Sequence, residues 1–258
     1  MTTQQKKTQR KPSPKTNTRS FLEHIQELKT RFFVWFAFLI IASGIGYFLY
    51  PHLLDWLITP LNKPLYYTSP IGGFEAVFTV SVFFGFVTSI PVLLFQVIRF
   101  LAPTIKSLSV KSYLAITTTS LVLAVSGIAL SYYLILPKAL EFLNKFGGEQ
   151  LSALISTSDY FSFITKYLVG FAILFQLPLV MYLVNKYHKL EVKKLLANFK
   201  YVFLVSFIIS AILTPTPDMI NQAIMAAPIL VLYLISVLVV WISSWRIFSL
   251  AKQTKRHV

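Results

Sequence analysis

Six apolar runs separated by polar stretches occupy most of the chain. Five of the runs hold about 20 residues or more, the length that an α-helix needs to cross a hydrocarbon core about 30 Å thick. The remaining run, 201–213, would cover only about 20 Å as a helix. The pattern predicts an all-α integral membrane protein with spans at 32–50, 76–98, 112–136, 160–184, 201–213 and 223–242.

The basic residues give this arrangement an orientation. Of the 24 Lys and Arg residues, 20 lie in four alternate polar stretches that contain only 3 acidic residues. Basic residues in short loops mark the cytoplasmic face of a membrane protein, or the stromal or matrix face in an organelle. We therefore expect both termini on that face and an even number of spans. The four stretches are 1–31, 99–111, 185–200 and 245–258.

The expected even number of spans decides how the short run 201–213 is interpreted. A run of this length can be re-entrant or interfacial, but the last basic stretch would then face away from the other three. A sixth span avoids this conflict and requires a thinner bilayer nearby. The sequence therefore predicts a disordered basic tail at 1–19, a six-helix membrane domain at 20–245, and a basic tail at 246–258. We expect Pro137 to end the third span, and Ser158 and Asp159 to cap the fourth.

Composition and charge exclude several classes of protein. Mean hydropathy is +0.67 and 13% of residues are charged, which does not suit the polar surface of a soluble domain. The net charge of +15 is divided by the apolar runs, so we expect attraction to anionic lipid and no nucleic-acid partner. Cysteine is absent, the four histidines are scattered, and no phosphate-binding loop or Ser-His-Asp set occurs. We expect no enzyme, no metal site and no cofactor.

An amphipathic stretch before the first span carries two carboxylates. Glu23 and Glu27 lie four residues apart and share one face of the predicted helix. Apart from Glu191, they are the acidic residues of the basic face. Two interpretations stay open: a surface ion-pair network, and an acceptor for an incoming cation, most naturally a guanidinium.

Few other polar residues interrupt the apolar runs. Gln176, in the fourth run, would cost several kcal/mol if its amide were unsatisfied in hydrocarbon. It should therefore face protein, water or a partner helix, and the carbonyl of Leu174, which loses its usual donor because of Pro178, is one internal candidate. We expect Lys166 to snorkel to the interface. Structural roles are assigned to Pro60, Pro91 and Asp218, with Asp218 capping the sixth span.

Five segments match, in order and spacing, the pattern of one family. They read SFLEHIQELKTR, FQVIRFLAP, LPKALEFL, SDYFSFITKYLVGFAILFQLPLV and ILTPTPDMINQAIMAAPILVLY. Through them, residues 20–242 resemble the TatC family, the multispanning core of the twin-arginine protein translocase.

The resemblance implies a core subunit that binds the twin-arginine signal peptides of folded precursors. It also implies a curved scaffold with a groove, small single-span partners of the TatA and TatB type, an oligomeric receptor complex, and transport driven by the proton-motive force. The membrane would be a bacterial inner membrane, or a thylakoid or mitochondrial inner membrane if an organelle encodes the chain. The alternative is a small-molecule secondary transporter or channel, which would need charged clusters or broken helices near the midplane.

Site residues follow from the resemblance as well. Glu27 matches the glutamate of the family pattern H-L-x-E-L-R, and Lys29 stands at its arginine, keeping the charge without a planar donor. Phe100 and Pro103 match F-x-A-P at the start of the first cytoplasmic loop. Many members carry a glutamate later in that loop, but this chain does not, so either one carboxylate suffices or Glu23 supplies the second. Gln176 stands where bacterial members often have Glu, which favours contact with a partner helix through the groove.

Overall fold

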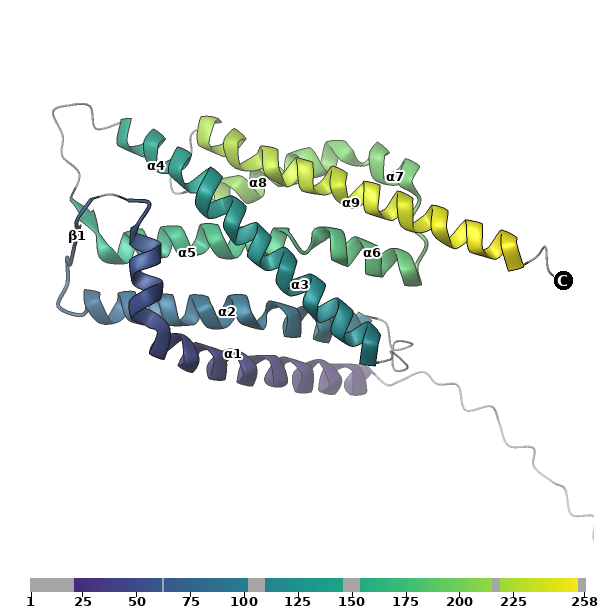
Figure 1. Cartoon of the computed structure of the whole chain (residues 1–258), viewed down its shortest axis with the longest axis horizontal. Helices are drawn as coiled ribbons and strands as arrows, with labels where there is room; N and C mark the ends of the chain where they lie inside the picture. The colour runs from purple at the N-terminus through teal and green to yellow at the C-terminus, as the bar shows by residue number, and fades with distance from the viewer. Residues whose placement is uncertain (1–20, 62, 102–109, 146–153, 215–218, 255–258) are drawn as a thin grey trace, which may run out of the picture.

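The computed structural model describes residues 21–61, 63–101, 110–145, 154–214 and 219–254, and this part of the chain is almost entirely helical (Figure 1). Five helical segments within it are long and apolar enough to cross a membrane: Ile25–Ile58, Gly72–Phe100, Val110–Glu141, Thr157–Tyr187 and Gln222–Trp245. Helix α8 (Phe199–Leu213) is apolar but has only 15 residues. The predicted all-helical membrane architecture is confirmed.

Helix α1 (Phe21–Ile58) joins the amphipathic stretch and the first apolar run in one element. Pro51 lies inside it, and the helix changes direction near its C-terminal end (Figure 1). A proline inside a helix removes one backbone hydrogen bond and bends the helix without always ending it. The helix therefore continues beyond residue 50, while the bounds of the span in the membrane stay a prediction. Pro60 lies in the turn that follows, where the N–H of Leu61 donates to the carbonyl of Ile58 at 2.9 Å.

Helix α2 (Gly72–Leu101) packs along α1, and small residues allow the close approach. A Cβ added at Gly85 would lie 2.7 Å from the backbone nitrogen of Ser43, so only glycine fits at this crossing. Nearer the cytoplasmic ends predicted for these helices, the indole N–H of Trp35 donates to the hydroxyl of Ser89 at 3.1 Å. Pro91 is buried within α2 and does not end it.

The third apolar run continues past its predicted end. Helix α3 (Val110–Leu130) leads into a π-helical turn, η2 (Ser131–Ile135), and then into α4 (Leu136–Lys145). The N–H of Leu136 donates to the carbonyl of Ser131, five residues back. We attribute the tolerance of Pro137 to this wider turn, which alters the bonding register just where Pro137 supplies no N–H. The prediction that Pro137 stops the span is wrong.

The fourth run forms one candidate span, Thr157–Tyr187, but its helix is interrupted. Helix α5 (Thr157–Leu174) and helix α6 (Leu177–Tyr187) are separated at Phe175 and Gln176, with Pro178 in the first turn of α6. Helix α5 begins at Thr157 after the N-cap residue Ser156, which makes no side-chain capping bond. The predicted capping by Ser158 and Asp159 is therefore wrong, since both lie in the first turn.

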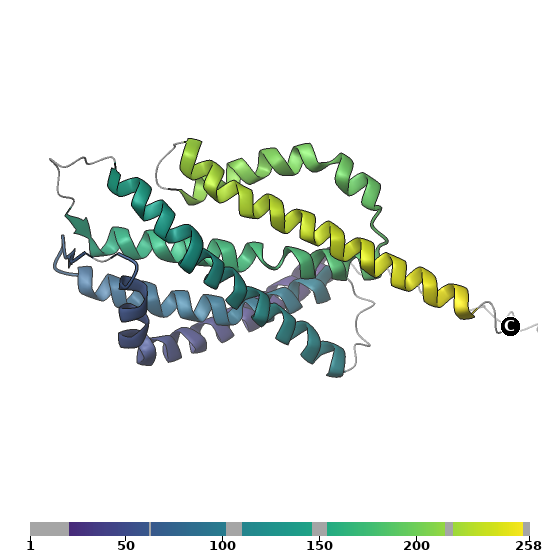
Figure 2. The same cartoon turned by 45° about the horizontal axis from the view of Figure 1, so that its top comes forward.

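The C-terminal part contains α7 (Val192–Ala197), α8 and the long helix α9 (Met219–Thr254). Helix α9 packs against α6 and α8, which run beside it in Figures 1 and 2. It continues to Thr254, so the part of the predicted basic tail that the structure describes is helical. Asp218, the predicted cap of this helix, lies outside the described residues.

The two ends of the helix assembly differ in character. At one end, strand β1 (Leu65–Tyr66) pairs in parallel with β2 (Ile155–Ser156), joining two connections that are far apart in sequence. At the other end lie the start of α1, helix α7 and the end of α9 (Figure 1). We call these the β end and the basic end, the latter because Lys29, Lys193 and Lys194 lie there.

Helix α5 lies at the centre of the packing and supplies much of the buried core. It contacts α2, α3 and α8, and Phe161, Ile164, Leu168 and Phe171 are almost fully buried. The hydroxyl of Tyr160 donates to the carbonyl of Leu57 at 2.7 Å. This bond fixes the bent end of α1 against α5.

Candidate functional site

The carboxylate of Glu27 lies one helical turn from Arg31, near the basic end of α1. The guanidinium of Arg31 donates to Oε1 of Glu27, and the two side chains are only 12% and 23% exposed for Arg31 and Glu27 respectively. The ion-pair interpretation left open by the sequence is thus present as an i,i+4 pair. It also shows that a guanidinium can reach this carboxylate in a suitable geometry.

An apolar pocket of about 320 Å³ lies beside this pair, between α1 and α2. The Nε atom of Arg31 is buried there and has no hydrogen-bond partner in the described part of the chain. The pocket is lined by Leu28, Arg31, Phe32, Trp35, Leu93, Gln96, Val97 and Phe100. Sequence reasoning missed Arg31, although its spacing from Glu27 was a usable signal. The pocket itself depends on how α1 and α2 pair, which no local pattern gives.

Of the other residues predicted at this end, the structure brings one to the pocket. Phe100 is half-buried and lines the pocket, so the structure brings it to the same site as Arg31. Lys29 is exposed, does not line the pocket, and has its ammonium 5.9 Å from the ring centre of Phe33. Glu23 belongs to α1, but its side chain lies outside the described residues, as does Pro103.

Gln176 occupies the break between α5 and α6 and is 5% exposed. Its Nε2 donates to the carbonyls of Ser120 (3.1 Å) and Ala172 (3.2 Å), and its Oε1 accepts from the hydroxyl of Ser120 at 2.8 Å. The Ala172 carbonyl is available because the backbone N–H of Gln176 donates to the carbonyl of Ile173 and not to that of Ala172. The internal partners of the Gln176 amide are thus Ala172 and Ser120, not Leu174. Its contact with a partner helix through the groove stays a prediction.

A second buried amide was missed by the sequence reasoning. Asn185, near the end of α6, is 2% exposed. Its Nδ2 donates to the hydroxyl of Ser244 on α9 at 3.1 Å, and its Oδ1 accepts from the N–H of Leu190 at 2.9 Å. Asn185 therefore fixes the turn before α7 against α9. Its position at the end of an apolar run was the available signal, but its partners are distant in sequence.

Within the described ranges, no group of three or more His, Cys, Asp or Glu side chains could hold a metal ion. The arrangement is suited to binding a cation through Glu27 and apolar groups through the adjacent pocket.

Comparison with known proteins gives a consistent result. The sequence model of a family described as "Sec-independent protein translocase protein (TatC)" matches residues 23–228. The chain is 31% identical to the Sec-independent protein translocase protein TatC of Carboxydothermus hydrogenoformans, covering 85% of this chain and 92% of the relative. It is 34% identical to a tatC-like protein of Trieres chinensis, covering 83% of this chain and 81% of that one.

A solved structure shares the fold. The crystal structure of a "Twin Arginine Translocase Receptor- TatC" superposes with a TM-score of 0.73 at 30% sequence identity. The match covers 86% of this chain and 99% of the solved one. Sequence and structure thus agree on one family.

Proposed function

This chain belongs to the TatC family of Sec-independent protein translocase proteins, and we propose that it binds the twin-arginine signal peptides of folded precursors. In this proposal it also organises small single-span partner subunits, and the proton-motive force drives transport. The word receptor in the name of the solved relative supports this assignment by similarity. The support from the chain itself comes from Glu27.

One observation carries the proposal: the carboxylate of Glu27 already holds a guanidinium, that of Arg31. An arginine of a signal peptide would present the same group to the same atoms, and a carboxylate–guanidinium bond is charge-assisted. The adjacent pocket would then receive apolar side chains next to the arginines, with Phe100 at its wall. Binding here is an exchange, in which the peptide's arginine takes the place of Arg31.

The remaining site residues stay predictions. Glu23 is the candidate second carboxylate, because it lies one turn before Glu27 on α1. Lys29 and Pro103 are proposed to border the bound peptide, and Asp218 to cap the last span. Contact between Gln176 and a partner helix also stays a prediction, and it would require Ser120 to be displaced first.

We further propose six spans with both termini on the cytoplasmic, stromal or matrix side. With 15 residues, α8 would cover about 22 Å, so its crossing implies a locally thin bilayer. In support, α1 begins and α9 ends at the basic end (Figure 1), where short-loop lysines gather. A curved scaffold with a groove and an oligomeric receptor complex remain part of this proposal.

Site-specific photocrosslinking of a precursor to membranes containing the full chain tests the role of Glu27. The change is Glu27→Gln, which removes the charge but keeps the shape. We expect crosslinking of a precursor with two signal arginines to fall severalfold, because a neutral amide loses the charge-assisted bond. The matched control is Glu191→Gln, since Glu191 also lies at the basic end and pairs with Lys194, but is 63% exposed and far along the chain.

Equal crosslinking in the wild type, Glu27→Gln and Glu23→Gln would refute the assignment of the acceptor. A loss of crosslinking in Glu191→Gln of the same size as in Glu27→Gln would also refute it. In that case the peptide would respond to the general charge of this end and not to one carboxylate.

A further inference from the structure

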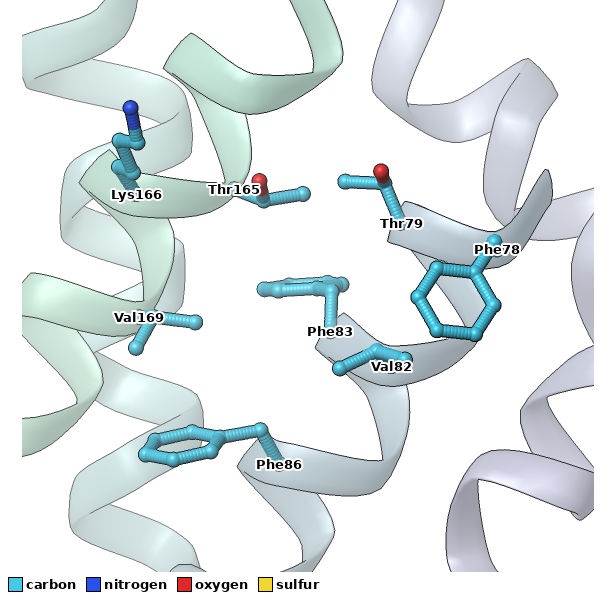
Figure 3. A pocket seen from close by; sticks show the side chains of 8 residues that line it. All are labelled: Phe78, Thr79, Val82, Phe83, Phe86, Thr165, Lys166 and Val169. Atoms are coloured by element: carbon cyan, nitrogen blue, oxygen red, sulfur yellow. The ribbon is translucent and has the colours of Figure 1, made fainter. Parts of the chain in front are cut away.

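A second pocket, of about 320 Å³, lies between α2 and α5 (Figure 3). Its α2 residues belong to the first half of that helix, which starts at the β end (Figure 1). Its wall is apolar, formed mainly by Val82, Phe83, Phe86 and Val169. One charged residue, Lys166, lines it. Among the residues that the structure describes, no carboxylate forms an ion pair with Lys166. A lysine without a counter-ion within an apolar span is costly, so such residues usually have a functional partner.

The position of Lys166 along α5 indicates the depth of this charge. It lies nine residues after Thr157, the first residue of α5, or about 14 Å along the helix. In Figure 3 its side chain extends away from Val169, toward the end at which α5 begins. The threonines Thr79 and Thr165 lie at the same end of the pocket. The polar groups therefore gather toward the membrane surface at the β end, and the apolar wall continues toward the bilayer centre.

We propose that this pocket binds a phospholipid with a net negative head group, taken from the leaflet at the β end. The phosphate accepts hydrogen bonds from the ammonium of Lys166, and one acyl chain lies against Val82, Phe83 and Val169. A lysine that snorkels places its stem along apolar surface and its charge at head-group level. The phosphate supplies the anion that the described residues do not.

Charge and size both favour a lipid over a peptide helix in this pocket. Among the described residues that line it, the one charged group is a cation, whereas an apolar helix offers no anion at this depth. A volume of 320 Å³ holds about ten groups of roughly 30 Å³, the share of one water in the liquid. That is room for part of one acyl chain. A whole helix, about 10 Å across, could lie over this open space but could not fill it.

Native mass spectrometry of the purified full chain, with dioleoyl phosphatidylglycerol and dioleoyl phosphatidylcholine as probes, tests the proposal. We expect the wild type to bind one phosphatidylglycerol about fivefold more tightly than phosphatidylcholine, the factor for one lysine near anionic lipid. Lys166→Met should abolish this preference, and Lys166→Arg should keep it. The matched control is Lys138→Met, because Lys138 is an exposed lysine of α4, does not line the pocket and lies toward the same end.

Several results would overturn the proposal. One is a preference for phosphatidylglycerol that survives in Lys166→Met, and another is an equal loss in Lys138→Met. A third is a combination of two results: a twin-arginine signal peptide displaces the lipid, and Lys166→Met leaves the affinity for that peptide unchanged. The pocket would then be a peptide site. The variant Glu27→Gln should leave lipid binding intact, so this proposal and the proposed receptor function fail separately.

Discussion

At the scale of single residues, Gln176 is a buried amide whose hydrogen bonds are all made within the chain. It joins the break between α5 and α6 to Ser120 on α3. We predict that Gln176→Leu lowers the free energy of unfolding by about 1–3 kcal/mol, because the Ser120 hydroxyl and the freed carbonyls lose their partner. Gln176→Glu should be tolerated better, since a protonated carboxyl group keeps an acceptor and one donor.

Thermal unfolding in detergent, combined with Ser120→Ala in a double-mutant cycle, measures this contribution. The two changes should be non-additive, because both remove the bond from the Ser120 hydroxyl to Oε1 of Gln176. Additive effects would contradict the contact. If Gln176→Leu keeps its stability but loses its single-span partners on co-purification, the predicted partner contact is the better account of this residue.

Arg31 gives a second prediction at this scale. Because it occupies the carboxylate of Glu27, it competes with an incoming arginine. An i,i+4 pair of this kind contributes roughly 0.3–0.5 kcal/mol, so Arg31→Met should raise the affinity for a twin-arginine peptide about twofold while keeping an apolar pocket wall. Titration of a fluorescent signal peptide measures the change. Weaker binding in Arg31→Met would mean that Arg31 contacts the peptide directly.

The sequence predicted several of the residues that belong to the candidate sites, but it did not predict all of their hydrogen-bond partners. The scarcity of acids on the basic face pointed to Glu27, and its spacing from Arg31 was available within one helix. The partners of Gln176 were out of reach, because Ser120 lies 56 residues away. Which side of α5 meets α3 is decided by the packing of the whole bundle.

At the scale of elements, close approach of α1 and α2 depends on Gly85. A Cβ there would lie 2.7 Å from the backbone nitrogen of Ser43. We therefore predict that Gly85→Ala destabilises the protein by about 1–3 kcal/mol, as overpacking does. Gly44→Ala is the matched control on α1, since nothing lies within 4 Å of its added Cβ. It should be neutral or stabilise slightly through helix propensity. Equal melting temperatures for the two variants would contradict the predicted close packing.

Prolines account for the places where the observed helices depart from the apolar runs. Pro51 and Pro137 lie within continuous helical segments, whereas Pro178 follows a break. The local chemistry is the same in each case, because the ring removes one donor and crowds the preceding turn. The outcome differs because a bend is tolerated near the end of α1, a π turn precedes Pro137, and the Gln176 amide satisfies a carbonyl at the break. These compensations come from the surroundings and not from the proline itself.

At the scale of the whole molecule, the arrangement of the ends leads to a prediction of topology. Cysteine labelling is direct because the chain has no cysteine. A membrane-impermeant maleimide should label Ser69→Cys from the side opposite to that on which it labels Lys193→Cys. The reason is that the connection after α1 and the turn at α7 lie at opposite ends of the bundle (Figure 1). Labelling of both sites from one side would contradict the proposed orientation.

The measurement that tests the central claim most directly is the ratio of two affinities for the full chain in lipid nanodiscs. One peptide carries the two signal arginines, and the other has lysines in their place. We predict that the wild type prefers the arginine peptide by about tenfold, since a carboxylate binds a planar guanidinium in a geometry that an ammonium lacks. In Glu27→Gln this ratio should approach one. A preference for arginine that persists undiminished in Glu27→Gln would contradict the account.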